Sequence, residues 1–90
     1  MFNMSRISDE KKDRIKEEIV RVFFEQYPRR WWTYDISDEM IRDDEFILKL
    51  LKELENKGLV VNTKESKGGK IKRKWGLSKL QYEKFKELFN

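Results

Sequence analysis

Residues 47–60 read ILKLLKELENKGLV, and this stretch decides the fold. Its apolar residues Ile47, Leu50, Leu51 and Leu54 are three or four positions apart, which places them on one face of a helix. Gly58 follows, and glycine is typical of helix ends because it adopts the left-handed conformation without strain. Apolar, β-branched residues then begin an extended segment. The stretch therefore predicts a helix over 44–57 that passes directly into a strand.

A β-hairpin is predicted over 59–77. Gly68 and Gly69 lie between two extended runs, as the tip of a hairpin requires. In the returning run, side chains alternate between two sets, and the period of two predicts that one set faces the core while the other faces solvent. The expected core set is Ile71, Arg73, Trp75 and Leu77, and the outer set is Lys70, Lys72, Lys74 and Gly76.

Four further elements complete the predicted order. A first helix over 9–26 ends before Pro28, because the residue before a proline disfavours helical geometry. A short strand is expected over 32–35, and Ser37 is expected to cap a helix over 37–42. Ser78, with Gln81 three residues later, forms a capping box for a last helix over 79–89. That helix is expected to bury Tyr82, Phe85, Leu88 and Phe89.

Length and composition limit the classes of protein. Ninety residues suffice for one domain, taken here as 1–90, and twelve aromatic residues give it a core. The chain has no cysteine and no histidine, which removes thiolate metal sites and the commonest general base. No apolar run approaches the ~20 residues that cross a bilayer. We expect a cytoplasmic protein that is not an enzyme, with no cofactor, membrane contact or small-molecule effector.

The order of helix, short strand, two helices, hairpin and helix resembles the winged helix-turn-helix superfamily. The resemblance rests on residues 47–60, which are similar to the end of a recognition helix entering the wing. It rests also on Lys74-Trp75-Gly76-Leu77-Ser78, which is similar to the close of the wing. It implies an α+β fold with a three-helix core, a small antiparallel sheet and a C-terminal helix.

The resemblance implies binding of double-stranded DNA by a transcriptional regulator, with the third helix in the major groove and the wing on the backbone. Between residues 64 and 74 there are six basic residues and one acidic residue, a local charge of +5, so the rest of the chain carries −1 of the net +4. Engaging about four of these cations with phosphates predicts a salt slope of roughly −3.6 on logarithmic axes. The six are Lys64, Lys67, Lys70, Lys72, Arg73 and Lys74.

The expected recognition helix offers fewer contacts. Lys49 and Lys52 suit phosphate or guanine, and Asn56 suits adenine. Glu45 lies four residues before Lys49 and can pair with it, while the acids at the helix start, Asp43 and Asp44, repel phosphate. Arg29 and Arg30, in the loop after the first helix, are further candidate phosphate contacts.

Other interpretations of the same residues stay open. A lysine-rich hairpin also protects a sheet edge from aggregation, without binding anything. Trp32 and Trp75 fit the core better than a base-stacking role, whereas Trp31 fits either burial or contact with a partner. A winged helix can also serve as a protein-interaction module, through Trp31, Leu48, Asp43 and Asp44, or can bind structured RNA. Domains of this superfamily often form homodimers, through the first helix, the last helix or Leu48.

Enzymatic interpretations have less support. Acidic residues between 35 and 44 are explained by the dipoles of two helix starts without any metal ion. Glu65-Ser66-Lys67 matches a nuclease fragment that is expected by chance in so charged a chain. Lys67-Gly68-Gly69-Lys70 lacks the first glycine and the hydroxyl residue of a phosphate-binding loop.

Overall fold

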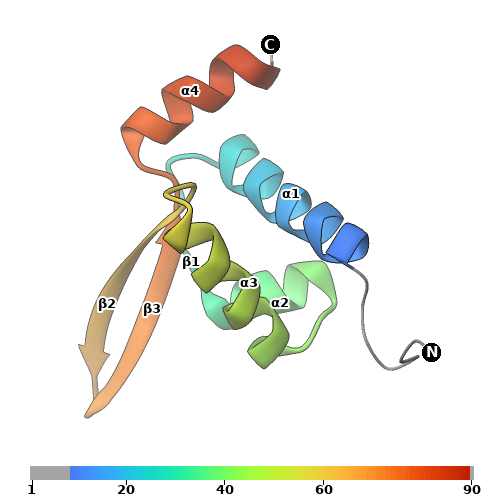
Figure 1. Cartoon of the computed structure of the whole chain (residues 1–90). Coiled ribbons are helices and arrows are strands. Elements are labelled where there is room, and N and C mark those ends of the chain that lie inside the picture. Colours follow the sequence, from blue (N-terminus) through green and yellow to red (C-terminus); the bar gives the residue numbers. More distant parts are fainter. Residues whose placement is uncertain (1–8, 90) are drawn as a thin grey trace, which may run out of the picture.

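The computed structural model describes residues 9–89, which form four helices and a three-stranded antiparallel sheet in an α+β arrangement (Figure 1). In chain order the elements are α1 (Asp9–Glu25), β1 (Trp31–Trp32), α2 (Thr33–Met40), α3 (Asp44–Asn56), β2 (Val61–Lys67), β3 (Lys70–Gly76) and α4 (Lys79–Phe89). Within these residues no helix has the length and apolar character to cross a membrane.

Helix α3 has the buried face that its sequence predicts. Ile47, Leu50, Leu51 and Leu54 are all at most 3% exposed. The carboxylate of Asp43 caps the helix start by accepting hydrogen bonds from two backbone N–H groups of the first turn. After the helix, Gly58 has a φ of 75°, a conformation that a side chain would strain. The chain then turns back along α3 toward β2.

The sheet has the order β1-β3-β2, and its register decides which tryptophans enter the core. Trp31 lies opposite Trp75, which is fully buried and donates a 2.9 Å hydrogen bond from Nε1 to Thr33 Oγ1. Residues directly opposite each other share one face of a sheet, so Trp31 also faces the core and is 4% exposed. Trp32, for which the sequence predicts a core position, therefore faces the other side and is half-buried.

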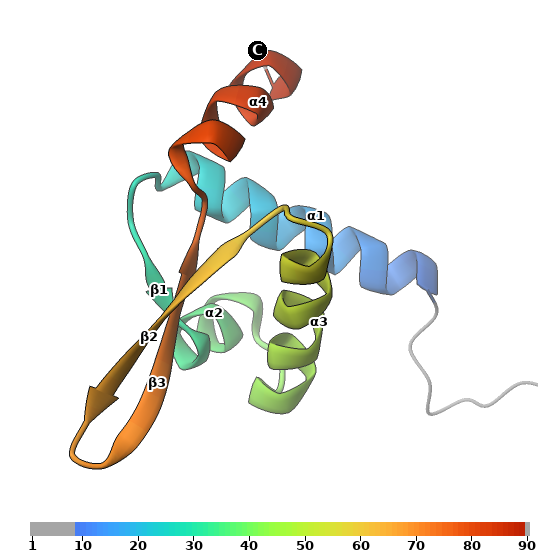
Figure 2. The same cartoon turned by 60° about the vertical axis from the view of Figure 1, so that its left-hand side comes forward.

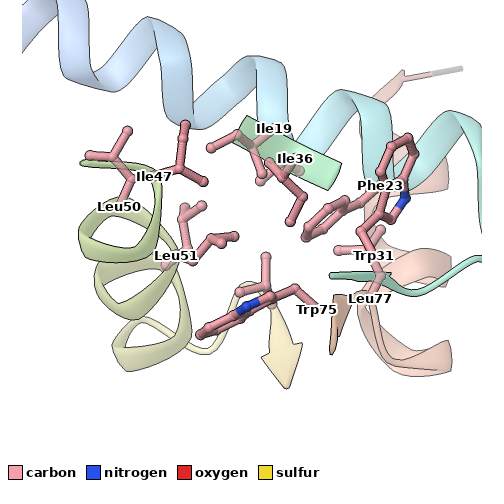
Figure 3. Packing of buried hydrophobic residues seen from close by; sticks show 12 residues of the cluster. Ile19, Phe23, Trp31, Ile36, Ile47, Leu50, Leu51, Trp75 and Leu77 are labelled. Atoms are coloured by element: carbon pink, nitrogen blue, oxygen red, sulfur yellow. The ribbon is translucent and has the colours of Figure 1, made fainter. Parts of the chain in front are cut away.

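The core fills the space between the helices and the sheet. Side chains from α1, α2 and α3 converge there on Trp75 and on Leu77 just after β3 (Figure 3). Burying apolar area at about 25 cal/mol per Å² is the main stabilising contribution in such a cluster. Its members are Ile19, Val20, Phe23, Trp31, Ile36, Ile47, Leu50, Leu51, Leu54, Val60, Trp75 and Leu77.

Helix α2 begins four residues earlier than predicted. The expected strand over 32–35 is reduced to Trp31–Trp32, and the helix starts at Thr33. Ser37, expected as its cap, is inside the helix and 4% exposed, and its Oγ donates to the backbone oxygen of Thr33. The early start places Ile36 in the core at 3% exposure, a gain that outweighs the strand preference of this segment.

The hairpin extends beyond the helices, and this corrects one expected core position. In Figures 1 and 2 the strands β2 and β3 run away from the helical part of the molecule toward the glycine turn. Ile71, near that tip, is 70% exposed, although Trp75 on the same face is fully buried. Alternation thus predicted the side correctly, but no described helix covers the tip.

Helix α4 has the predicted start but a thinner buried stripe. Ser78 Oγ accepts a 3.1 Å hydrogen bond from the backbone N–H of Gln81, as a helix cap does. The Gln81 side chain does not return to Ser78 but donates to the backbone oxygen of Gly58, 2.7 Å away. Leu88, expected to be buried, is 74% exposed, and the side chain of Phe89 lies outside what the structure describes. Tyr82 attaches the helix by stacking on Tyr27, with ring centroids 4.0 Å apart.

An ion pair joins α1 to α3 and predicts a pH dependence of stability. Lys16 Nζ lies 2.6 Å from Glu53 Oε1, and this hydrogen bond lowers the pKa of the Glu53 carboxyl below its ordinary value of 4.5. A carboxyl whose pKa is lowered by folding stabilises the fold above its unfolded pKa, and the contribution is lost as pH falls through the folded pKa. Since the Glu53 side chain is 43% exposed, the contribution is at most about 1 kcal/mol.

Urea denaturation of the wild type and of Glu53→Gln at pH 7 and pH 3 measures this contribution. We expect the variant to be less stable at pH 7 and the difference to shrink at pH 3. An equal difference at both pH values would show that the ion pair does not stabilise the fold.

Candidate nucleic-acid interface

The register of the hairpin divides its cations between two faces. Counting outward from the glycine turn, Lys64 pairs with Arg73 and Asn62 with Trp75. Because Trp75 faces the core, Lys64 and Arg73 lie on the same side of the sheet as α3. Lys72 and Lys74 project from the opposite side. The predicted phosphate contacts of the hairpin are therefore divided between the two sides of the sheet.

Two cations of the hairpin share a groove with α3. This α3–hairpin groove, of about 640 Å³, lies between the second half of the helix and the sheet. Among the residues predicted to bind nucleic acid, the structure brings four together here: Lys52, Asn56, Lys64 and Arg73. Lys52, Asn56 and Lys64 are exposed, while Arg73 is half-buried.

Apart from Trp75, the residues that line the groove are polar or charged. Asn62 Nδ2 donates a hydrogen bond to the Glu55 carboxylate, which links the sheet to α3. Among the described residues that line the groove, Glu55 is the one acidic residue, against three basic residues. The groove thus combines an excess of positive charge with amide and hydroxyl groups, among them Thr63. Such a lining suits an anionic chain that also offers hydrogen-bonding groups.

The opposite face of the hairpin pairs lysine with aromatic rings. Lys74 Nζ lies 4.7 Å from the centroid of the Trp32 ring and 3.5 Å from Glu65 Oε1. Lys72 Nζ lies 5.8 Å from the Trp32 ring and 6.0 Å from the Tyr34 ring. Lys74 is therefore partly neutralised within the chain, whereas Lys72 has aromatic neighbours and remains exposed. At the tip Lys70 is exposed, and the side chain of Lys67 is not described.

Arg29 and Arg30 lie at the base of the hairpin and do not line the groove. The Arg29 guanidinium stacks on Trp31, 3.6 Å from the ring centroid. The Arg30 side chain lies against Gly76, where an added β-carbon would be only 2.5 Å from Arg30 Cδ. Both arginines are exposed, so they remain able to contact a phosphate, but at a place distinct from the groove.

Helix α3 has an acidic first turn, and its exposed lysines lie further along the helix. Asp44 and Glu45 are exposed in the first turn, beside the capping carboxylate of Asp43. Lys49 is exposed one turn before Lys52 and lies outside the groove lining. Phosphate is therefore repelled at the start of the helix and attracted locally by Lys49 and Lys52. In the described part of the chain, no group of three or more acidic residues has an arrangement that could hold a metal ion.

Comparison with known proteins found no match to a family model and none to a curated sequence. The function is therefore inferred from the geometry of the chain itself.

Sequence reasoning missed four residues that the structure adds to these surfaces. Asn62 and Thr63 line the groove. Their position could have been found by pairing the two strands from the glycine turn, which places Asn62 opposite the buried Trp75. Tyr34 and Ile71 are 52% and 70% exposed beside the lysines of the hairpin. Their exposure depends on where α2 begins and on how far the hairpin extends, and no signal in the sequence gives either.

Proposed function

We propose that this chain is a winged helix-turn-helix protein that binds double-stranded DNA, acts as a transcriptional regulator and is not an enzyme. The order of elements and the β1-β3-β2 sheet are compatible with that fold, in which α3 would be the recognition helix and the β2–β3 hairpin the wing. The observation that carries the proposal is the convergence of Lys52, Lys64 and Arg73 on one groove from two different elements.

The distribution of charge supports one orientation on the duplex. The sugar-phosphate backbone would follow the α3–hairpin groove, where the three cations replace its counterions. Asn56 and Lys52 on α3 would then be the side chains nearest to base edges. The acidic first turn of α3 would point away from the backbone, because Asp44 and Glu45 repel it.

The alternative of a protein-interaction module depends on residues that have roles inside the fold. Trp31 is 4% exposed and covered by Arg29, and Asp43 caps α3. Leu48 is half-buried and packs against the core cluster. Because of these contacts, little of the surface proposed for protein interaction is accessible to a partner, whereas the basic groove is accessible to DNA.

Fluorescence anisotropy with a labelled duplex, a single strand and a structured RNA tests the proposal. We expect the blunt duplex to bind more tightly than the single strand or the RNA, with an affinity that falls with salt at a slope of about −3 to −4. Tighter binding of structured RNA would reassign the partner. Absence of binding to all three nucleic acids would overturn the proposal.

A further inference from the structure

A second hollow, of about 340 Å³, lies beside the hairpin and is distinct from the α3–hairpin groove. Strand β1 pairs with only the last part of β3, at Trp75 and Lys74. Beyond Lys74, residues 70–73 of β3 have β2 on one side and, within the described chain, no strand on the other. The chain leaves β1 directly into α2, and the hollow opens between the start of α2, α3 and this free edge.

The hollow has an aromatic and apolar floor. It is lined by Trp32, Tyr34, Leu48 and Ile71, and we call it the aromatic hollow. Tyr34 is 52% and Ile71 70% exposed, so a large apolar area faces water here. Its volume lies at the lower end of the roughly 300–1,000 Å³ found for sites that hold small ligands. A single flat ring system can be accommodated in this volume and can stack on the exposed rings.

The two rims of the aromatic hollow carry opposite charges. Lys72 and Arg73 lie on the hairpin side, and Lys72 Nζ is within 6.0 Å of both aromatic rings. Asp44 and Glu45 lie on the α3 side. A nucleotide has the complementary arrangement, since its phosphate suits the basic rim and its base suits the rings. The exocyclic amino groups of a base can donate to the carboxylates, which at the same time repel a second phosphate.

We propose that the aromatic hollow binds one unpaired nucleobase of DNA, stacked on Tyr34 and Trp32, with its phosphate at Lys72 and Arg73. This inference rests on the proposed function and extends it, because Arg73 also lines the α3–hairpin groove. A strand that leaves a duplex in the groove can thus pass over Arg73 into the hollow. The preferred substrate is then duplex DNA with an unpaired segment at its end.

Anisotropy titrations that compare a blunt duplex with the same duplex carrying a short single-stranded tail test the inference. Tails on the 5′ and the 3′ end are measured separately. We expect one of the two tails to tighten binding about tenfold, as the stacking of one base on an aromatic side chain does. Tails that add nothing at either end would overturn the inference while leaving duplex binding intact.

Two substitutions of Tyr34 separate stacking from simple exposure. Tyr34→Leu removes the ring but keeps an apolar side chain, and we expect it to abolish the tightening by the tail while blunt-duplex affinity stays within about twofold. Tyr34→Phe keeps the ring and is expected to retain the wild-type response. Since the side chain is half exposed, both variants should fold, which circular dichroism checks. A wild-type tail response in Tyr34→Leu would contradict the inference.

Tryptophan fluorescence gives a second readout. Trp31 and Trp75 are buried, so quenching by a bound base is expected to come from Trp32. The tailed duplex should quench the emission more than the blunt duplex, and Trp32→Phe should remove that excess. Binding of tailed DNA without binding of blunt duplex would support base binding in the hollow and overturn the proposal of duplex binding in the groove. Failure of the inference and failure of the proposed function therefore give different results.

Discussion

Replacing Lys52, Lys64 and Arg73 together with alanine is expected to weaken binding of blunt duplex DNA about 100-fold. Among the described residues that line the α3–hairpin groove, these three side chains supply all of the positive charge. An exposed contact between a cation and a phosphate contributes about 1 kcal/mol, and a factor of ten corresponds to about 1.4 kcal/mol. Because the variant no longer neutralises three phosphates, its logarithmic salt slope should be smaller in magnitude by about 2.7.

A matched control separates local contacts from net charge. Lys79, Lys84 and Lys86 are exposed on α4, away from the groove, and their replacement by alanine changes the net charge by the same amount. We expect this variant to bind duplex within about threefold of the wild type. Equal decreases in affinity for the two triple variants would mean that the chain attracts DNA by overall charge and that the groove has no special role.

Replacing Trp75 with alanine is expected to cost about 3–5 kcal/mol of the free energy of unfolding. Trp75 is fully buried and packs within the core (Figure 3). It donates its Nε1 hydrogen to Thr33. The substitution leaves a cavity and an unpaired hydroxyl at once. Since single domains have about 5–15 kcal/mol in total, this is a large part of the stability. The midpoint of thermal denaturation, followed by circular dichroism, should fall by roughly 10 °C or more.

Trp32→Ala is the control for this second prediction. Trp32 is one residue from the buried Trp31 but only half-buried, so its removal should cost about 1–2 kcal/mol. Trp75→Phe retains most of the packing and removes the hydrogen bond, which should cost about 1 kcal/mol beyond the effect of the smaller buried area. A larger destabilisation by Trp32→Ala than by Trp75→Ala would contradict the observed register of β1 on β3.

Much of the fold follows from patterns that are local in sequence. The buried stripe of α3, the glycine turn of the hairpin and the Ser78 cap of α4 each act within a few residues, and the sequence predicts all three. The start of α2 is not predictable from local sequence. Serine is a common helix cap, but Ser37 lies inside the helix and donates a hydrogen bond to the backbone oxygen of Thr33. Here the burial of Ile36 outweighs local preference.

Exposure near the ends of elements depends on tertiary structure. Trp32 is half-buried and not in the core, and Trp31, whose environment the sequence leaves open, is buried. Pairing with Trp75 sets the face, and that pairing joins two segments far apart in the sequence. Ile71 and Leu88 have core-like spacing, yet the hairpin and α4 extend past the elements that would cover them. Periodicity predicts on which side of an element a residue lies. It does not predict whether another element extends far enough to bury that residue.

The positive charge of the candidate interface is predictable from the sequence, but the distribution of its cations between two faces of the hairpin is not. The concentration of lysine and arginine between residues 64 and 74 is visible in the sequence. The separation into a groove with Lys64 and Arg73 and an aromatic face with Lys72 and Lys74 requires the register. Charge alone groups Arg29 and Arg30 with the other cations, whereas the stacking on Trp31 and the packing on Gly76 depend on the folded chain.

The most direct test of the proposed DNA-binding groove is a map of backbone amide chemical shifts during titration with blunt duplex DNA. We expect the largest changes in residues 49–56 of α3 and 61–76 of the hairpin, with α1 and the second half of α4 almost unchanged. Changes confined to α1, α2 or α4, with the amides of Lys52, Lys64 and Arg73 unaffected at saturation, would contradict the proposal.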